Sequence, residues 1–362
     1  MYTEMIKIIE GGLRGDKEKV LNYSKLLVKI LNQNGEARLA EKINAIIDSN
    51  KPGFITLDSL STKPVDTESR LEMVDIEYII EGSLSPVLGK HVESSVENFI
   101  NQYLKRDLIL QKGISLDSTL LLYGPPGCGK STLARYIAMK TQLPLVTVRL
   151  DGLISSLLGS TAKNIRKIFD YAAKKECILF LDEFDVIAKI RDDKNDLGEL
   201  KRVVNSLLQN IDEFSENSIL IAATNHHQML DSAVWRRFST IVLLDLPKRD
   251  EIEIFVVKLL SNIGNDITAS KLKLDSIVNT LIGNSFSAIE TIVHNSIKKV
   301  IINNKTSISS LDILQETYLY LYHSVDNEDN FVKYLLDNGV TQKELNEELG
   351  FSLRKVRELS KL

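Results

Sequence analysis

A glycine-rich segment between an apolar run and a helical stretch constrains this chain more than any other feature. Leu120–Tyr123 is apolar, and the residues that follow it match the pattern G-x-x-x-x-G-K-[ST]. Glycines let backbone N–H groups curl around phosphate oxygens, and the following helix presents its positive N-terminal end to the same anion. The sequence therefore predicts a phosphate-binding loop. Its residues are Gly124, Pro125, Pro126, Gly127, Cys128, Gly129, Lys130, Ser131 and Thr132.

The residues in and beyond this loop predict a site for a nucleoside triphosphate and Mg²⁺. In enzymes with such a loop, the lysine pairs with the β- and γ-phosphates and the next hydroxyl coordinates the metal, which are the roles expected of Lys130 and Ser131. Farther along, an apolar run ends in Asp182 and Glu183. We expect Asp182 to hold Mg²⁺ through water and Glu183 to polarise the attacking water. Asp185 is interpreted as a helix cap.

Short apolar runs alternate with helical stretches in the central part of the chain. This alternation is typical of a parallel sheet with helices on both faces. We therefore predict an α/β fold of the P-loop NTPase type, with the parallel sheet in residues 71–247 and a helical lid without strands in residues 248–322. The predicted strands are Thr119–Tyr123, Leu145–Arg149, Ile178–Asp182, Ile219–Ala223 and Ile241–Leu246.

Helical patterns without strands predict further units on both sides of this region. Residues 1–50 repeat apolar side chains at helical spacing, which predicts a small helical bundle for packing or docking. Residues 51–70 contain two prolines and many polar residues, and they are interpreted as a linker. Residues 323–362 contain three helical stretches and are predicted to form a helix-turn-helix-like unit.

The composition excludes several classes of protein. A formal net charge of −4 means that the chain as a whole is not a polyanion binder. The sequence contains neither an apolar run of the roughly 18 residues that a membrane span needs nor an N-terminal signal pattern. Its two cysteines, Cys128 and Cys177, cannot form a disulfide framework. We therefore expect a cytoplasmic protein with no membrane partner.

Further motifs over about residues 85–322 resemble the AAA ATPases, the family that includes spastin-like and proteasomal motors. Ile221–Asn225 resembles the sensor-1 strand, in which the residue corresponding to Asn225 reads the γ-phosphate and positions water. Leu230–Phe238 resembles the part of the family fold that presents arginine fingers. The resemblance implies that Arg236 and Arg237 reach a neighbouring subunit's nucleotide. The resemblance implies ATP hydrolysis by a ring of identical chains, most often a hexamer.

Two more segments carry the resemblance into the lid and the pore. The residues after Gly283 resemble the family's lid-helix start, which implies that Ser287 and Ala288 lie near the adenine. The segment around Leu157 and Leu158 resembles the loop that lines the pore of family unfoldases. Those proteins usually carry an aromatic residue where this chain has Leu157, and leucine offers less contact area and no planar ring. Threading of a polypeptide therefore stays open.

Residues 341–361 resemble a helix-turn-helix. Thr341 and Ser352 are good N-caps, and Gly350 permits the turn between them. The last helix has an excess of basic residues, which a helix that reads a DNA groove would need. Residues 325–362 as a whole nevertheless contain six basic and eight acidic residues, and such shapes also serve protein contacts. DNA binding and partner docking both stay open. The predicted packed seam is Leu345, Leu349, Phe351 and Val356.

The resemblance implies an ATP-hydrolysing AAA ring ATPase that uses ATP and Mg²⁺ to remodel or activate a protein partner. The layout is similar to that of bacterial ATPases paired with a separately encoded effector, such as a protease or a defence effector, although no residue identifies one. One alternative is a DNA-associated ATPase addressed by the C-terminal helix-turn-helix. Another is a nucleotide-driven assembly switch that closes around a partner without threading it.

Overall fold

The chain divides into two compact units, Met1–Thr62 and Lys63–Leu362. The computed structural model describes residues 73–360 apart from 81, 83, 117, 150–157, 187–197 and 215–217, together with residue 64 and scattered positions between 7 and 43. In the first unit, helical residues bury a small apolar cluster. The division falls inside the predicted linker, most of which lies outside the described residues. The buried residues of the cluster are Leu27, Val28, Leu31 and Ala40.

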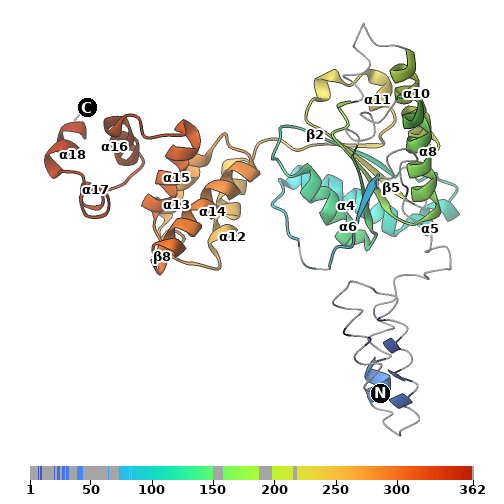
Figure 1. The fold of residues 1–362 in the computed structure, drawn as a ribbon, viewed down its shortest axis with the longest axis horizontal. Helices are drawn as coiled ribbons and strands as arrows, with labels where there is room; N and C mark the ends of the chain where they lie inside the picture. The colour runs from blue at the N-terminus through green and yellow to red at the C-terminus, as the bar shows by residue number, and fades with distance from the viewer. Residues whose placement is uncertain are drawn as a thin grey trace. The chain divides into compact units, whose positions relative to one another are not determined.

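Six strands of the second unit form one sheet in the order β1-β3-β4-β5-β2-β6. Figure 1 shows this sheet, with β2 and β5 labelled, among its flanking helices. All neighbouring strands run parallel except β1 and β3, which are antiparallel. This mostly parallel sheet with flanking helices confirms the predicted α/β fold of the P-loop type. The strands are β1 (Val74–Glu77), β2 (Thr119–Tyr123), β3 (Leu145–Arg149), β4 (Ile178–Asp182), β5 (Ile219–Thr224) and β6 (Thr240–Leu243).

The predicted strands agree closely with the observed ones in the middle of the sheet and less well at its edges. β2, β3 and β4 have the predicted bounds, and β5 ends one residue later than predicted, at Thr224. β6 ends at Leu243 rather than Leu246 because its only neighbour, β2, ends at Tyr123. The antiparallel strand β1 was missed, since a four-residue edge strand carries little pattern of its own.

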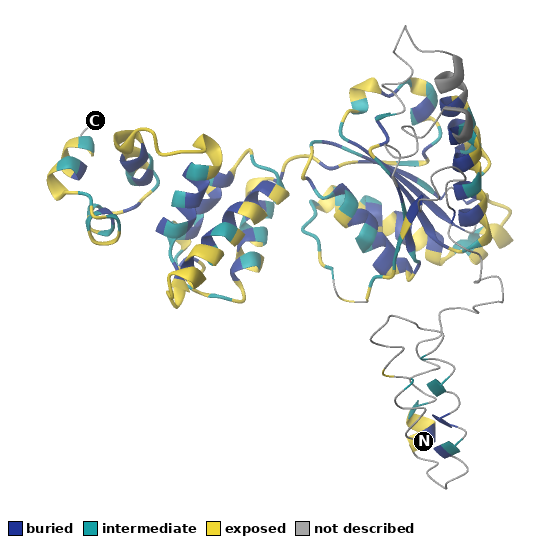
Figure 2. Ribbon diagram, in the orientation of Figure 1, coloured by how far each residue is buried: buried dark blue, intermediate teal, exposed yellow. Residues whose placement is uncertain are grey.

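Helices cover both faces of the sheet, and the strands between them are mostly buried (Figure 2). Alternate strand residues belong to two separate cores. On one face, α8 (Leu158–Lys174) and α10 (Gly198–Asp212) pack against side chains such as that of Leu179. On the other, α4 (Lys90–Leu104) and α6 (Lys130–Thr141) pack against Phe180 and its neighbours. The shorter elements are α5 (Arg106–Gln111), the 3₁₀ turn His227–Met229 and α11 (Ser232–Trp235).

From α12 onward, the described residues are helical apart from one short ladder of two two-residue strands, β7 and β8. This ladder corrects the prediction of a lid without strands, because strands of two residues leave no alternating pattern in the sequence. Helices α12 to α15 bury a core of their own. Helices α16 to α18 share a further core with α15. These elements are α12 (Arg249–Leu260), β7 (Gly264–Asn265), α13 (Lys271–Leu281), α14 (Phe286–Ile302), β8 (Ser307–Ile308), α15 (Ser310–Tyr322), α16 (Glu328–Asp337), α17 (Gln342–Leu349) and α18 (Leu353–Leu359).

The predicted helix-turn-helix seam is present at the C-terminal end of the described chain. Leu345 and Val356 are fully buried, and Leu349 and Phe351 pack against them. The side chain of Asn346 donates a hydrogen bond to the backbone oxygen of Phe351 (2.7 Å), which fastens the turn. Among the described residues, no helix combines the length and the apolar character that crossing a bilayer requires.

Candidate nucleotide site

The phosphate loop connects β2 to α6, and its backbone needs glycine at several positions. Gly124, Gly127 and Gly129 all have positive φ angles, of 139°, 74° and 90°. A Cβ on Gly124 would lie 2.0 Å from the backbone oxygen of Leu244, where no side chain fits. Helix α6 begins at Lys130, so the unbonded N–H groups of its first turn face the loop.

Lys130 is buried inside the loop that precedes it. Its ammonium group donates hydrogen bonds to the backbone oxygens of Gly124 and Pro125, both at 2.8 Å. Burial lowers the pKa of Lys130, while the nearby Cys128 and Asp182 act in the opposite direction. The loop therefore holds a cation where phosphate oxygens would enter. The Cys128 thiol is itself buried, and this burial raises its pKa.

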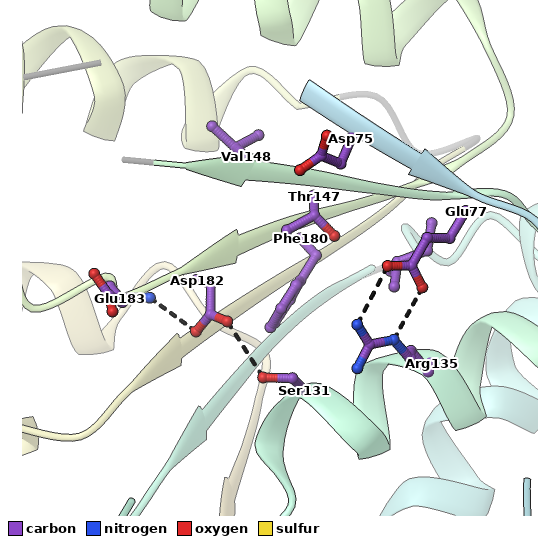
Figure 3. Close-up of a pocket in the computed structure, with 10 residues that line it drawn as sticks. Asp75, Glu77, Ser131, Arg135, Thr147, Val148, Phe180, Asp182 and Glu183 are labelled. Carbon is purple, nitrogen blue, oxygen red and sulfur yellow. Dashed lines mark hydrogen bonds and ion pairs between the residues drawn. The ribbon is translucent and has the colours of Figure 1, made fainter. Parts of the chain in front are cut away.

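Asp182, at the end of β4, faces the first turn of α6 (Figure 3). The Ser131 hydroxyl donates to Asp182 Oδ2 at 3.2 Å. The other carboxylate oxygen accepts a hydrogen bond from the backbone N–H of Glu183 at 2.9 Å. A hydroxyl and a carboxylate are hard oxygen ligands, of the kind that bind Mg²⁺ together with phosphate and water. These two side chains therefore fit the predicted metal.

Glu183 is held in a backbone conformation that few residues other than glycine adopt. Its φ angle is 53°, in the left-handed region. The next residue fixes this turn, because the N–H of Phe184 donates to the backbone oxygen of Ala223 on β5 (2.8 Å). Strained backbone that the surrounding structure enforces is concentrated at functional sites. The turn brings the Glu183 side chain to the wall of the cavity described below.

Asp185 is almost completely buried at the same end of the sheet. It accepts a hydrogen bond from the Thr224 hydroxyl (3.3 Å), and Thr224 in turn accepts one from the N–H of His226 (3.0 Å). These bonds hold the end of β5, immediately before and after Asn225. Asp185 thus links the end of β4 to the end of β5. Whether it caps a helix stays a prediction, because residues 187–197, where that helix would continue, lie outside the described residues.

One cavity of about 660 Å³ collects most of the predicted site residues. Lys130, Asp182, Glu183 and Asn225 line it, together with Ser131 and the rest of the loop from Pro126 to Thr132. From the lid, Ser287 lines the cavity and its N–H donates to the backbone oxygen of Gly127 (3.1 Å). Ala288 is buried beside it, and its N–H bonds to Ser285.

Part of this cavity wall was not predicted from the sequence. Leu84–Leu88, which precedes α4, forms one stretch of it, and Phe255 and Lys258 of α12 contribute from the lid. Lys258 donates a hydrogen bond to the backbone oxygen of Ser85, which ties the two stretches together. No phosphate-type motif marks these residues. Their place in the wall depends on contacts between segments far apart in the sequence, since this bond joins residues 173 positions apart.

The predicted arginine fingers lie away from this cavity. Arg236 is exposed, directly after α11. Arg237 forms an ion pair with Asp212 at the end of α10 (2.9 Å) and donates to the backbone oxygen of Ala233 (2.6 Å). Neither arginine lines the cavity of its own chain. Of the predicted pore residues, Leu158 begins α8, whereas Leu157 lies outside the described residues.

Comparisons with known proteins show which family this chain is similar to. Residues 120–246 match the model of the ATPase family associated with various cellular activities (AAA). A protein of Sinorhizobium fredii described as an AAA family ATPase is 41% identical over 213 residues, which are 59% of this chain and 63% of that protein. Proteasome-activating nucleotidase 1 of Haloferax volcanii is 32% identical over 52% of this chain and 49% of its own.

A eukaryotic relative and a solved structure extend the comparison. The 26S proteasome regulatory subunit 6A of Saccharomyces cerevisiae is 32% identical over 58% of this chain and 50% of its own length. The chain thus matches about half to two thirds of the length of these relatives. The crystal structure of the FIGL-1 AAA domain shares the fold, with a TM-score of 0.57 at 19% identity over 74% of this chain and 93% of that one. The chain therefore contains a domain of the AAA family of ATPases, which the family model matches over residues 120–246.

Proposed function

We propose that this chain binds ATP together with Mg²⁺ and hydrolyses it to ADP and phosphate. The observation that carries the proposal is the convergence of Lys130, Ser131, Asp182, Glu183 and Asn225 on one cavity. Its volume of about 660 Å³ falls in the range of small-molecule sites. In this proposal, the loop amides and Lys130 balance the charge of the phosphates, and the lid residues enclose the adenine ring of ATP.

In the proposed reaction, Glu183 accepts a proton from water as the water oxygen bonds to the γ-phosphorus. The bond from that phosphorus to the bridging oxygen breaks, and ADP leaves with the electron pair. Asn225, fixed by the bonds around Thr224, holds the water in line. Bound Mg²⁺, held by Ser131 and by Asp182 through water, would neutralise charge on the phosphate oxygens. Glu183 is suited to the proton transfer because its own backbone turn is fixed by Phe184.

We further propose that the working form is a homo-oligomeric ring, of six chains by analogy with the family. The positions of Arg236 and Arg237 outside their own cavity support this proposal, since a guanidinium from a neighbouring copy could then complete the site. Names of the relatives, such as proteasome-activating nucleotidase, support a role in acting on a protein partner. That partner would be a protein to be remodelled or an effector such as a protease.

The substitution Glu183→Gln tests the proposed chemistry. The amide cannot accept the proton, whereas the groups that bind phosphate and metal are unchanged. We expect the rate of phosphate release to fall by about two orders of magnitude or more, with ATP affinity retained. Phosphate release and equilibrium binding of a fluorescent ATP analogue would be measured on the same samples.

Glu97→Gln, at an exposed position of α4, is the matched control and should leave both quantities unchanged. Turnover at the wild-type rate in the Glu183→Gln protein would refute the assignment of the general base. If the Glu183→Gln protein binds ATP and still activates a partner fully, the assembly switch is favoured over a cycle driven by hydrolysis.

The C-terminal helices support a second candidate, a DNA-associated ATPase. α17 and α18 have the predicted caps and the left-handed Gly350 turn of a helix-turn-helix. The charges of α18 weigh against groove reading, because Lys355 pairs with Glu328 and Asp329 at 3.0 and 2.9 Å. If DNA is the partner, salt-dependent binding of a fluorescent duplex should weaken when the exposed Arg357 is replaced by glutamate. Equal binding by both proteins would exclude recognition through α18.

A further inference from the structure

A second cavity, of about 490 Å³, adjoins the catalytic carboxylates (Figure 3). It shares Ser131, Asp182 and Glu183 with the nucleotide cavity. Its other charged lining comes from the edge strand β1 and from the second turn of α6. The nucleotide cavity uses none of these additional residues. They are Asp75, Glu77 and Arg135.

Arg135 and Glu77 form a two-bond ion pair across this cavity. The guanidinium donates from Nε to Glu77 Oε2 (2.9 Å) and from Nη2 to Oε1 (3.2 Å). This hydrogen-bonded contact lowers the pKa of Glu77 and raises that of Arg135. Both side chains are partly exposed, at 41% and 43%, so neither is locked in place by burial. The contact itself therefore decides where the guanidinium points.

Arg135 lies on the same face of α6 as the proposed magnesium ligand. It follows Ser131 by four residues, which places the two side chains one helical turn apart. The negative charge of Asp182 also reaches the guanidinium and contributes to its raised pKa. A guanidinium matches a carboxylate with two parallel hydrogen bonds. Without Glu77, Arg135 would thus have Asp182 of the same cavity as an alternative partner.

We propose that Glu77 is a positioning residue for the ATPase reaction: it holds Arg135 away from Asp182, so that this carboxylate stays available for Mg²⁺ and its bound water. The inference rests on the proposed function. It differs from a purely structural role, in which the pair only fastens β1 to α6. The two roles predict different results when both Glu77 and Arg135 are replaced. The positioning role predicts a nearly normal Mg²⁺ requirement, whereas the structural role predicts the same defect as in the single Glu77 variant.

The test measures the Mg²⁺ concentration that gives half-maximal binding of a fluorescent, non-hydrolysable ATP analogue to the full chain. Glu77→Gln keeps the size of the side chain and removes its charge. We expect the Mg²⁺ concentration needed for half-maximal binding to rise about three- to five-fold, because Arg135 then pairs with Asp182 and competes with the metal. A partly exposed ion pair changes an equilibrium by about this factor. Arg135→Gln and the double variant should both stay within about two-fold of wild type, because the competing cation is gone.

Glu176→Gln is the matched control, because it removes a comparable ion pair, that of Glu176 with Arg106 (3.4 Å). Glu176 lies just before β4 begins, at the opposite end of the strand from Asp182. Its Mg²⁺ requirement should equal that of wild type. An unchanged requirement in Glu77→Gln would overturn the proposal, as would a double variant at least as impaired as Glu77→Gln. If the wild-type chain binds no analogue at any Mg²⁺ concentration, the proposed function fails instead.

Discussion

At the scale of single residues, Gly127 joins the phosphate loop to the lid. A Cβ there would lie 2.6 Å from Ser285 Oγ and 3.0 Å from the Cβ of Ser287, and the backbone oxygen of Gly127 already accepts the N–H of Ser287. The loop motif leaves this position open, because its fixed glycines are Gly124 and Gly129. The structure gives the reasons for glycine here, which are the positive φ angle and the close approach of the lid.

Gly127→Ala should therefore lower the thermal unfolding midpoint and weaken ADP binding. The positive φ angle alone costs about 1–2 kcal/mol for any residue with a Cβ, and the clash with the lid adds to it. Gly113→Ala is the control, because Gly113 has a similar φ angle of 71° with nothing within 4 Å of its added Cβ. Equal losses of stability in the two variants, measured by calorimetry, would show that the lid does not press on Gly127.

At the scale of elements, α15 belongs to two cores at once. Ile313 packs into the lid core, whereas Leu311, Leu314 and Tyr318 pack with α16 to α18. The ring of Tyr318 lies 4.9 Å from that of Phe331 on α16. The sequence predicted a boundary at residue 322, where the helix ends. The structure continues one packed body across that boundary, so the C-terminal unit and the lid share a helix.

Leu345→Ala tests this shared packing. The side chain is fully buried between the C-terminal helices, and such truncations cost about 2–5 kcal/mol. We expect urea unfolding, followed by circular dichroism, to show a loss in this range for the cooperative unit that contains α15. Leu353→Ala, at a position that is 40% exposed, should cost well under about 1 kcal/mol. Loss of α16–α18 alone, with α15 and the lid unaffected, would contradict a shared core.

Elements with strong local patterns were predicted well, and those that depend on distant partners were not. The central strands and the carboxylates at the end of β4 follow from apolar runs of five or six residues. Strand β1 depends on pairing with β3, and the cavity wall at Leu84–Leu88 depends on Lys258 of α12. Likewise, the ion pair of Glu77 with Arg135 joins residues 58 positions apart. Contacts of this kind leave no periodic signal in a single sequence.

At the scale of the whole molecule, one chain holds only part of the proposed machinery. The cavity supplies the phosphate loop, the acidic pair and Asn225, whereas Arg236 and Arg237 lie elsewhere on the same chain. If a second copy supplies the arginines, hydrolysis depends on association. The specific activity should then rise with chain concentration until the oligomer is saturated.

Release of phosphate from ATP in the presence of Mg²⁺, followed over a range of concentrations of the 362-residue chain, tests the central claim most directly. We predict release that saturates with ATP, and a rate per chain that increases with chain concentration and then levels off. A rate per chain that is constant from dilute to concentrated protein would contradict the shared site. No release at any concentration would contradict ATP hydrolysis by this chain.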